Sequence, residues 1–234
     1  MSYPMKTIKA YNNTEFLNSR SAREIRVMCE MVECKERLQR CGIKSLVSFF
    51  GSARTRPDNK YYKDSYEIAY QMSKWCQSNM PDAAISSGGG PGIMEAVNKG
   101  AIDAGGPSIG MGISLPFEQH NNNYISKDLS FEFHYFFTRK YWCVYLAKAF
   151  IVMPGGVGTL DELFEVLTLR QTQKITLPVP IVLYDKPFWD DVINFDALVK
   201  HKTISPKDMK LFKICNSPEQ VVNYVTKNLK KYFT

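Results

Sequence analysis

Residues 149–162 read AFIVMPGGVGTLDE, an apolar run followed by a glycine-rich loop and by residues that suit the start of a helix. Residues 149–153 carry no polar side chain, a pattern typical of a strand that is buried on both faces of a parallel sheet. Glycine lets the loop turn tightly and lets its amide groups approach a ligand without a Cβ in the way. A helix N-terminus adds free N–H groups and a positive dipole end, so this stretch predicts a phosphate site.

Short apolar runs alternate with amphipathic stretches on both sides of this segment. The expected strands are 45–50, 83–86, 108–114, 149–153, 179–184 and 211–215. The expected helices are 61–78, 93–104, 138–148, 160–173, 188–200 and 218–230. This alternation predicts an α/β domain with a mainly parallel sheet and helices on both faces. In such a sheet, ligands bind beyond the carboxyl ends of the strands.

The residues before this domain have a different pattern. A charge-rich helix is expected from Thr14, a suitable N-cap, to Gly42, a suitable stop signal. Its partial apolar stripe consists of Ile25, Met28, Val32 and Leu38. We therefore expect residues 1–43 to form a helical extension packed on a single domain of residues 44–234.

The composition favours an ordinary soluble protein with one anion site. The chain has 234 residues and a net charge of +7, but it contains no block of five or six like charges. No motif for binding nucleic acid accompanies the basic balance. The six cysteines and three histidines show no metal-ligand spacing, and no apolar run is long enough to span a membrane. A cytoplasmic location without a metal, a membrane or a nucleic-acid partner is expected.

Two further loops follow expected strands. Residues 87–92 read SGGGPG and open a helix, whereas residues 51–54 read GSAR. One such loop would be explained as a simple turn, but two glycine loops at helix starts of one sheet favour phosphate binding. The Walker pattern is absent and the pattern of a Rossmann NAD site is poor, so neither an NTPase nor a dehydrogenase is expected.

Carboxylates and cations lie beside these loops. Glu95 and Glu162 each stand at the start of a helix that a glycine loop opens, although Thr159 and Glu162 also fit a capping box. Asp161 is interpreted as solvated or structural. Arg139 and Lys140 are placed at the start of a helix, against its dipole. This placement indicates a counter-charge, either a carboxylate or a bound phosphate, unless the two cations are a simple surface pair.

Three of these stretches together resemble a known family. Residues 87–96 (SGGGPGIMEA), 137–140 (FTRK) and 154–162 (PGGVGTLDE) resemble the signatures of the LOG ("lonely guy") family. That family comprises cytokinin riboside 5′-monophosphate phosphoribohydrolases that were long labelled lysine decarboxylase-like. Residues 115–119 and 167–172 are similar to its bacterial branch. The likeness covers about residues 44–188.

The resemblance implies a Rossmann-like, doubly wound fold, a homodimer or higher oligomer, and no cofactor. It implies hydrolysis of the N-glycosidic bond of a nucleoside 5′-monophosphate, either prenylated or AMP-like, to free base and ribose 5-phosphate. Arg139 and Glu162 match the catalytic places. The substrate-binding places are matched by Gly89, Gly90, Glu95, Lys140, Gly155, Gly156, Val157, Gly158 and Thr159.

Two departures leave the base preference open. Val157 fills a position where an aromatic residue is common in the family, and residues 120–123 (HNNN) replace a stretch that usually contains proline. The alternative function is a nucleotide- or cofactor-binding protein without turnover, built on the same loops. Retention of both Arg139 and Glu162 favours the enzyme. Lysine decarboxylation is not expected, because the chain lacks a recognisable lysine context for pyridoxal phosphate.

Overall fold

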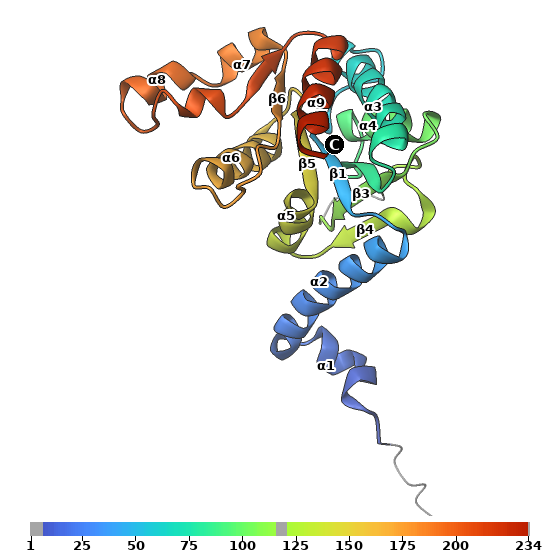
Figure 1. Cartoon of the computed structure of the whole chain (residues 1–234). Coiled ribbons are helices and arrows are strands. Elements are labelled where there is room, and N and C mark those ends of the chain that lie inside the picture. Colours follow the sequence, from blue (N-terminus) through green and yellow to red (C-terminus); the bar gives the residue numbers. More distant parts are fainter. Residues whose placement is uncertain (1–6, 116–120, 234) are drawn as a thin grey trace, which may run out of the picture.

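The computed structural model describes residues 7–115 and 121–233 (Figure 1). Its centre is a sheet in the order β4-β3-β2-β1-β5-β6-β7. The strands are β1 (Ser45–Phe50), β2 (Ala83–Ser87), β3 (Ser108–Ile113), β4 (Ser130–Phe133), β5 (Ala147–Val152), β6 (Ile181–Tyr184) and β7 (Lys213–Cys215). Each pairing among the described strands is parallel. The chain runs outward from β1 to β4, returns to the centre at β5 and then runs outward on the other side, which is the doubly wound topology that we expected.

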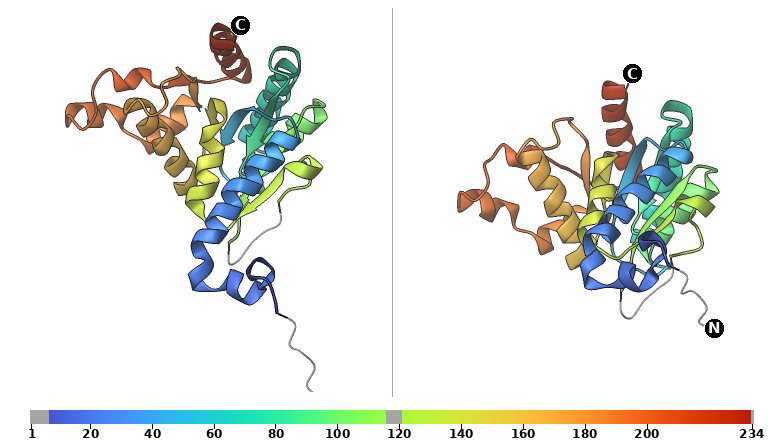
Figure 2. Two further views of the ribbon diagram at one scale, coloured as in Figure 1. Left: turned by 60° about the horizontal axis from the view of Figure 1, so that its bottom comes forward. Right: turned by 90° about the horizontal axis from the view of Figure 1, so that it is seen from below.

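Helices cover both faces of this sheet. On one face lie α3 (Lys60–Asn79), α4 (Ile93–Asp103) and α9 (Pro218–Phe233), whose apolar side chains share one core cluster. On the other face lie α2 (Arg23–Arg40), α5 (Phe136–Tyr145) and α6 (Val157–Gln171), together with α7 (Lys186–Val192) and α8 (Phe195–Lys200). Figures 1 and 2 show this arrangement from three directions.

The central strands supply side chains to both clusters in alternation. Phe150 and Val152 of β5 belong to the cluster under α5 and α6, whereas Ala149 and Ile151 belong to the cluster under α3 and α9. Successive side chains of a strand point to opposite faces, so a strand covered on both sides has to be apolar throughout. This explains why the run at 149–153 predicted the fold.

The N-terminal segment differs from the expected single helix. A short helix, α1 (Thr14–Asn18), begins at Thr14 and is capped by Asn13 rather than by Thr14, because the Asn13 side chain accepts the N–H of Phe16. A turn then separates α1 from α2. Arg26 stabilises that turn by donating to the carbonyl groups of Leu17 and Ser19, each at 2.7 Å.

The expected apolar stripe of this helix is also only partly buried. Leu38 is buried, but Ile25, Met28 and Val32 are exposed, Met28 to 58%. α2 contacts the domain at several points: Glu30 accepts the N–H of His134 and the hydroxyl of Thr138, and Arg37 donates to the carbonyl of Ser130 at 2.7 Å. The start of α2 and α1 project away from the sheet (Figures 1 and 2).

Two other elements differ from the sequence-based expectation. β4 is an edge strand that was not among the six expected strands, and the expected helix 188–200 is divided into α7 and α8. Asn194 separates these two helices and caps α8 by accepting the N–H of Ala197 at 2.8 Å. No helix of the described residues is long and apolar enough to cross a membrane.

Candidate functional site

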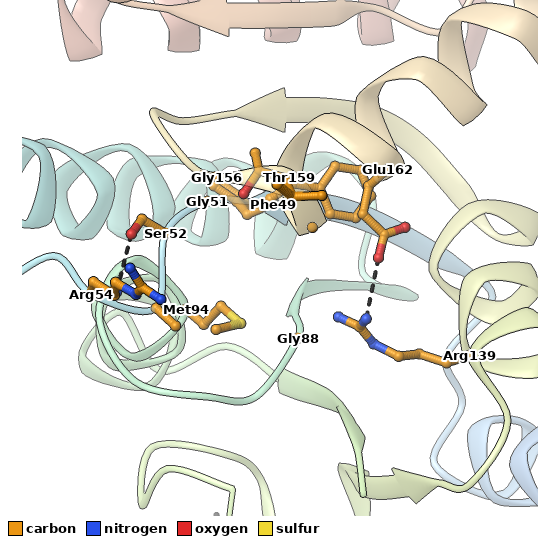
Figure 3. Close-up of a pocket in the computed structure, with 14 residues that line it drawn as sticks. Phe49, Gly51, Ser52, Arg54, Gly88, Met94, Arg139, Gly156, Thr159 and Glu162 are labelled. Atoms are coloured by element: carbon orange, nitrogen blue, oxygen red, sulfur yellow. Dashed lines mark hydrogen bonds and ion pairs between the residues drawn. The ribbon is translucent and has the colours of Figure 1, made fainter. Parts of the chain in front are cut away.

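A cavity of about 530 Å³ opens at the carboxyl ends of β1 and β5 (Figure 3). These two strands are neighbours at the point where the strand order reverses, which is where ligands bind in open α/β sheets. The described residues that line the cavity are Phe49, Phe50, Gly51, Ser52, Ala53, Arg54, Gly88, Met94, Arg139, Gly156, Val157, Gly158, Thr159 and Glu162. The loops after β1, β2 and β5 therefore meet in one place.

The N-terminus of α6 forms part of the cavity wall. The helix begins at Val157, its N-cap Gly156 offers no side chain, and its first turn contains no acidic residue. Thr159 lies inside this first turn, so the interpretation of Thr159 and Glu162 as a capping box was wrong. A Cβ built on Gly155 would lie 2.1 Å from Thr159 Oγ1, so glycine at 155 makes room for that side chain. The amide groups of the first turn are left for a ligand.

Arg139 and Glu162 form an ion pair in the wall of the cavity. Arg139 Nη1 lies 3.2 Å from Glu162 Oε1, and the two side chains are only 14% and 6% exposed. Arg139 also donates from Nε to the carbonyl of Met111 at 2.8 Å. Helical side chains lean toward the N-terminus of their helix, which directs Glu162 toward the phosphate loop one and a half turns before it. The counter-charge expected for Arg139 is thus a carboxylate.

Glu162 is a buried acid with one unsatisfied oxygen. Its Oε2 is buried and has no hydrogen-bond partner among the described residues. Burial raises the pKa of Glu162, and the nearby cations Arg139 and then Lys140 oppose that rise. A carboxylate with a raised pKa and a free oxygen in a cavity suits a general base.

Lys140 has carboxylate partners outside the cavity lining. Its Nζ lies 2.7 Å from Asp161 and 3.1 Å from Glu165. Glu95, which the sequence placed beside the nucleotide, accepts a hydrogen bond from the hydroxyl of Tyr62 at 2.7 Å. Of the expected substrate-binding residues, Gly156, Val157, Gly158 and Thr159 line the cavity, whereas Gly89, Gly90, Glu95, Lys140 and Gly155 are not among its described lining residues.

The triple-glycine loop approaches Arg139 closely. A Cβ on Gly88 would lie 2.7 Å from both a terminal nitrogen of Arg139 and the sulfur of Met94. Gly89 has a φ of 75°, which favours glycine. The backbone between β2 and α4 therefore forms the side of the cavity opposite α6, as Figure 3 shows for Gly88 and Met94.

Sequence reasoning did not identify three residues of this region. Ser52 and Arg54 line the cavity, although residues 51–54 were noted only for their glycine. Asn122 holds the triple-glycine loop, because its Nδ2 donates to the carbonyl groups of Gly89 and Gly90 at 2.9 and 3.0 Å. The departure from the family pattern at 120–123 was the available signal. Among the described residues, no group of His, Cys, Asp and Glu is placed to hold a metal ion.

Comparison with known proteins gives two kinds of relatives. A family model described as "Possible lysine decarboxylase" matches residues 94–225. A cytokinin riboside 5′-monophosphate phosphoribohydrolase of Arabidopsis thaliana is 26% identical over 201 residues, which cover 84% of this chain and 86% of the relative. An enzyme of the same name from Rhodococcoides fascians is 29% identical over 115 residues, which cover 47% of this chain and 56% of the relative.

The similar solved structures share the fold. A Moco carrier protein from Chlamydomonas reinhardtii matches with a TM-score of 0.54 and 19% identity, covering 80% of this chain and 99% of its own. The molybdenum cofactor binding protein of Rippkaea orientalis matches with a TM-score of 0.52 and 20% identity, covering 79% of this chain and 96% of its own. These matches place the described domain among Rossmann-like folds.

Proposed function

This chain belongs to the possible lysine decarboxylase family, also called the LOG family, and on that premise we propose that it hydrolyses a nucleoside 5′-monophosphate to free base and ribose 5-phosphate. The substrate class follows the names of the curated relatives, which are phosphoribohydrolases. Under this proposal the substrate is either a prenylated adenosine monophosphate or an AMP-like nucleotide.

One observation carries the proposal more than any other. A buried carboxylate with a free oxygen, Glu162 Oε2, lines the same cavity as the uncapped N-terminus of its own helix. The helix start suits the substrate's phosphate, which is an anion. The carboxylate suits the sugar, where positive charge develops as a glycosidic bond breaks.

In the proposed reaction, a water oxygen bonds to the anomeric carbon as the bond from that carbon to the base breaks. The electron pair of the broken bond leaves with the base, which takes up a proton. Glu162 accepts the proton that water loses and stabilises the oxocarbenium-like transition state. Arg139 orients the carboxylate through their ion pair, and it favours the ionised form that a base requires. Binding of the phosphate holds the sugar in place for this step.

Incubation of the purified protein with AMP and with isopentenyladenosine monophosphate tests the proposal, with chromatography of the released base. Base release is expected for the wild type and is expected to be lost in Glu162→Gln. Asp161→Asn is a matched control, because Asp161 is the neighbouring carboxylate, is half exposed and does not line the cavity. A folded wild type that releases base from neither nucleotide contradicts the proposal for these substrates. Nucleotide binding without release would indicate the alternative, a binding protein without turnover.

A further inference from the structure

Arg54 is a cavity residue with a free positive charge. It lines the cavity with Ser52 and with Gly156–Thr159, and it is exposed. No carboxylate lies within ion-pair distance of Arg54 in the part of the chain that the structure describes, whereas Arg139 is paired with Glu162. Figure 3 shows Ser52 and Arg54 on one side of the cavity, with Arg139 and Glu162 on the other. The charge of Arg54 is therefore available to a ligand at the side away from the buried acid.

The loop that carries Arg54 is tied to both glycine loops. The N–H of Ser52 donates to the carbonyl of Pro154 at 3.1 Å, and the carbonyl of Ser52 accepts the N–H of Ile93, the first residue of α4, at 2.9 Å. The N–H of Arg54 donates to Ser52 Oγ at 3.0 Å. These bonds fix the backbone from which the Arg54 side chain extends, beside the loop that opens α6.

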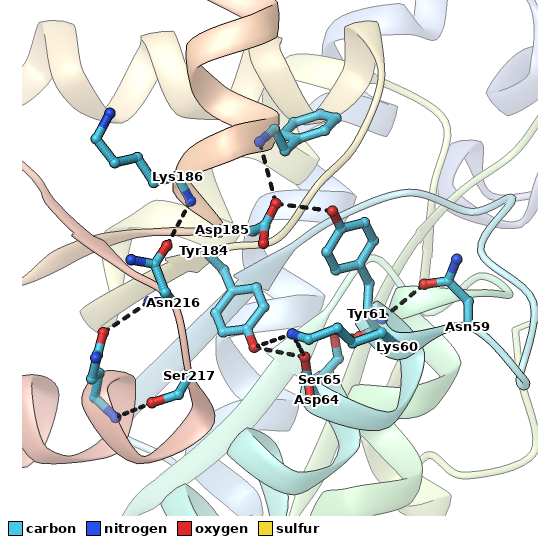
Figure 4. A network of polar contacts seen from close by, with 12 residues as sticks. Asn59, Lys60, Tyr61, Asp64, Ser65, Tyr184, Asp185, Lys186, Asn216 and Ser217 are labelled. Atoms are coloured by element: carbon cyan, nitrogen blue, oxygen red, sulfur yellow. Dashed lines mark hydrogen bonds and ion pairs between the residues drawn. The ribbon is translucent and has the colours of Figure 1, made fainter.

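The other end of the loop is fixed at the start of α3 (Figure 4). Lys60 binds Asp64 and lies 3.0 Å from the hydroxyl of Tyr184, which itself donates to Asp64 at 2.6 Å. Tyr61 donates from its hydroxyl to Asp185 at 2.9 Å. The network joins α3 to the end of β6, and burial together with Asp64 raises the pKa of Tyr184 to about 12, so its hydroxyl stays protonated. Residues 53–59 thus span two anchored points.

Positive charge accumulates around this side of the cavity without a negative partner. The α6 N-terminus has a positive dipole end, and its first turn contains no acidic residue. Arg54 adds a full charge to the lining of the cavity that contains this helix start. Glu162 Oε2, buried and unpartnered in the same cavity, gives an independent indication that a ligand completes the site.

We propose that Arg54 binds the phosphate group of the ligand together with the α6 N-terminus, and thereby selects a nucleoside 5′-monophosphate over the unphosphorylated nucleoside. The identity of this ligand rests on the proposed function; the phosphate chemistry rests on the cavity. A guanidinium group offers two parallel N–H donors to phosphate oxygens, which a lysine ammonium cannot reproduce. In this arrangement the backbone amides hold one side of the phosphate and Arg54 holds another.

Calorimetric binding of ribose 5-phosphate, inorganic phosphate and unphosphorylated ribose to Arg54→Gln tests the assignment. Loss of a charge-assisted contact is expected to weaken binding of ribose 5-phosphate by about 10- to 100-fold. Arg54→Lys is expected to lie between wild type and Arg54→Gln. Arg56→Gln is the matched control, because Arg56 lies two residues away in the same loop, is exposed near Asp58 and does not line the cavity. The KM for AMP is expected to rise in Arg54→Gln more than kcat falls, and the preference for AMP over adenosine is expected to narrow.

The outcomes separate this assignment from the proposed reaction. Binding of ribose 5-phosphate that depends on Arg54, with no base released from AMP, would support the phosphate contact and contradict the hydrolase. Base release with a wild-type KM in Arg54→Gln would support the hydrolase and overturn the role of Arg54. Equal weakening by Arg54→Gln and Arg56→Gln would also overturn it, because a general charge effect would then explain the loss. A wild type that binds neither ribose 5-phosphate nor inorganic phosphate would overturn the assignment outright.

Discussion

Glu162 pairs with Arg139 through only one of its two oxygens. Oε1 lies 3.2 Å from the guanidinium group, while Oε2 is buried and has no hydrogen-bond partner in the described part of the chain. A buried charge with an unsatisfied oxygen costs stability. The environment raises the pKa of Glu162 even with Arg139 beside it. A buried acid that costs stability in this way is a candidate for a functional role.

Glu162→Gln is expected to abolish base release and to remove the loss of stability that ionisation of Glu162 causes as the pH rises. The raised pKa means that ionisation of Glu162 disfavours the folded state, so the wild type loses stability as the pH rises through the folded pKa. Glutamine does not ionise. The melting temperature of the variant, measured relative to that of the wild type, should therefore rise between about pH 4 and pH 8, because only the wild type loses stability as Glu162 ionises. Base release should fall at least about 100-fold. A difference in melting temperature that does not change with pH would contradict this account.

Arg139→Ala is expected to move the acidic limb of the pH–activity profile to higher pH. Arg139 is the strongest of the groups that oppose the rise in the pKa of Glu162, and Lys140 is the next. Removal of Arg139 should therefore make Glu162 harder to ionise, so more alkaline conditions are needed to generate the base. Lys140→Ala should move the limb in the same direction by less. Profiles of kcat/KM against pH measure this order, and a larger effect of Lys140→Ala would be inconsistent with it.

Gly155→Ala is expected to lower stability, whereas Gly156→Ala is expected to weaken phosphate binding. A Cβ at Gly155 would lie 2.1 Å from Thr159 Oγ1, so alanine there should displace Thr159 and lower the melting temperature. A Cβ at Gly156 would meet no atom within 4 Å, but Gly156 lines the cavity. Gly156→Ala should keep the wild-type melting temperature and weaken phosphate binding. Thermal denaturation and calorimetry on the same two variants check the contrast, which would be refuted if both lost stability equally.

Asn122→Ala is expected to loosen the triple-glycine loop. The Asn122 side chain donates to the carbonyl groups of Gly89 and Gly90 and to Asn98 Oδ1, the last at 2.9 Å. Its loss leaves these acceptors short of a donor and should cost about 1–3 kcal/mol of unfolding free energy. Denaturant unfolding measures that cost, and the KM for AMP should rise with it. Asn123→Ala is the control, because Asn123 is exposed; equal effects of the two substitutions would count against the loop assignment.

The central part of the fold could be predicted because local pattern and environment agree there. Residues 149–153 are apolar throughout, and residues 45–50 are apolar except for Ser45 and Ser48. The strands that they form, β5 and β1, are covered on both sides. β4 has only four residues at the edge of the sheet, with Phe131 and Phe133 buried and Glu132 exposed. Its character as a strand depends on pairing with β3, which a short alternating pattern does not reveal.

The prediction for the N-terminal helix was wrong for a related reason. Its apolar spacing predicted a buried stripe, yet Ile25, Met28 and Val32 are exposed, although Glu30 in the same half of the helix bonds to His134 and Thr138. Periodicity identifies which side chains share a helix face, whereas burial depends on whether another element reaches that face. The interruption before α2 depends on bonds from Arg26 to two carbonyl groups, which spacing alone does not show.

In the candidate site, too, some residues could be predicted from local motifs and others could not. The glycine loops and the pair Arg139 and Glu162 were evident as motifs, because each lies next to a predicted strand end or helix start. Arg54 and Asn122 were not, because their importance depends on which loops meet after folding. Arg54 lines the same cavity as the α6 N-terminus because β1 and β5 are adjacent.

The adjacency of β1 and β5 also determines when the cavity can form during synthesis. Leu46 pairs with Ala147, and the chain between them builds β2, β3 and β4 with their helices. Contacts between residues so distant in sequence form slowly, since a long loop has to close first. A nascent chain that ends before β5 presents β1 as an unpaired apolar edge, which is open to aggregation. Docking of β5 covers that edge and, in the same step, brings the phosphate loop to the cavity. A chain that ends before residue 147 is therefore expected to contain β1 to β4 without the phosphate site.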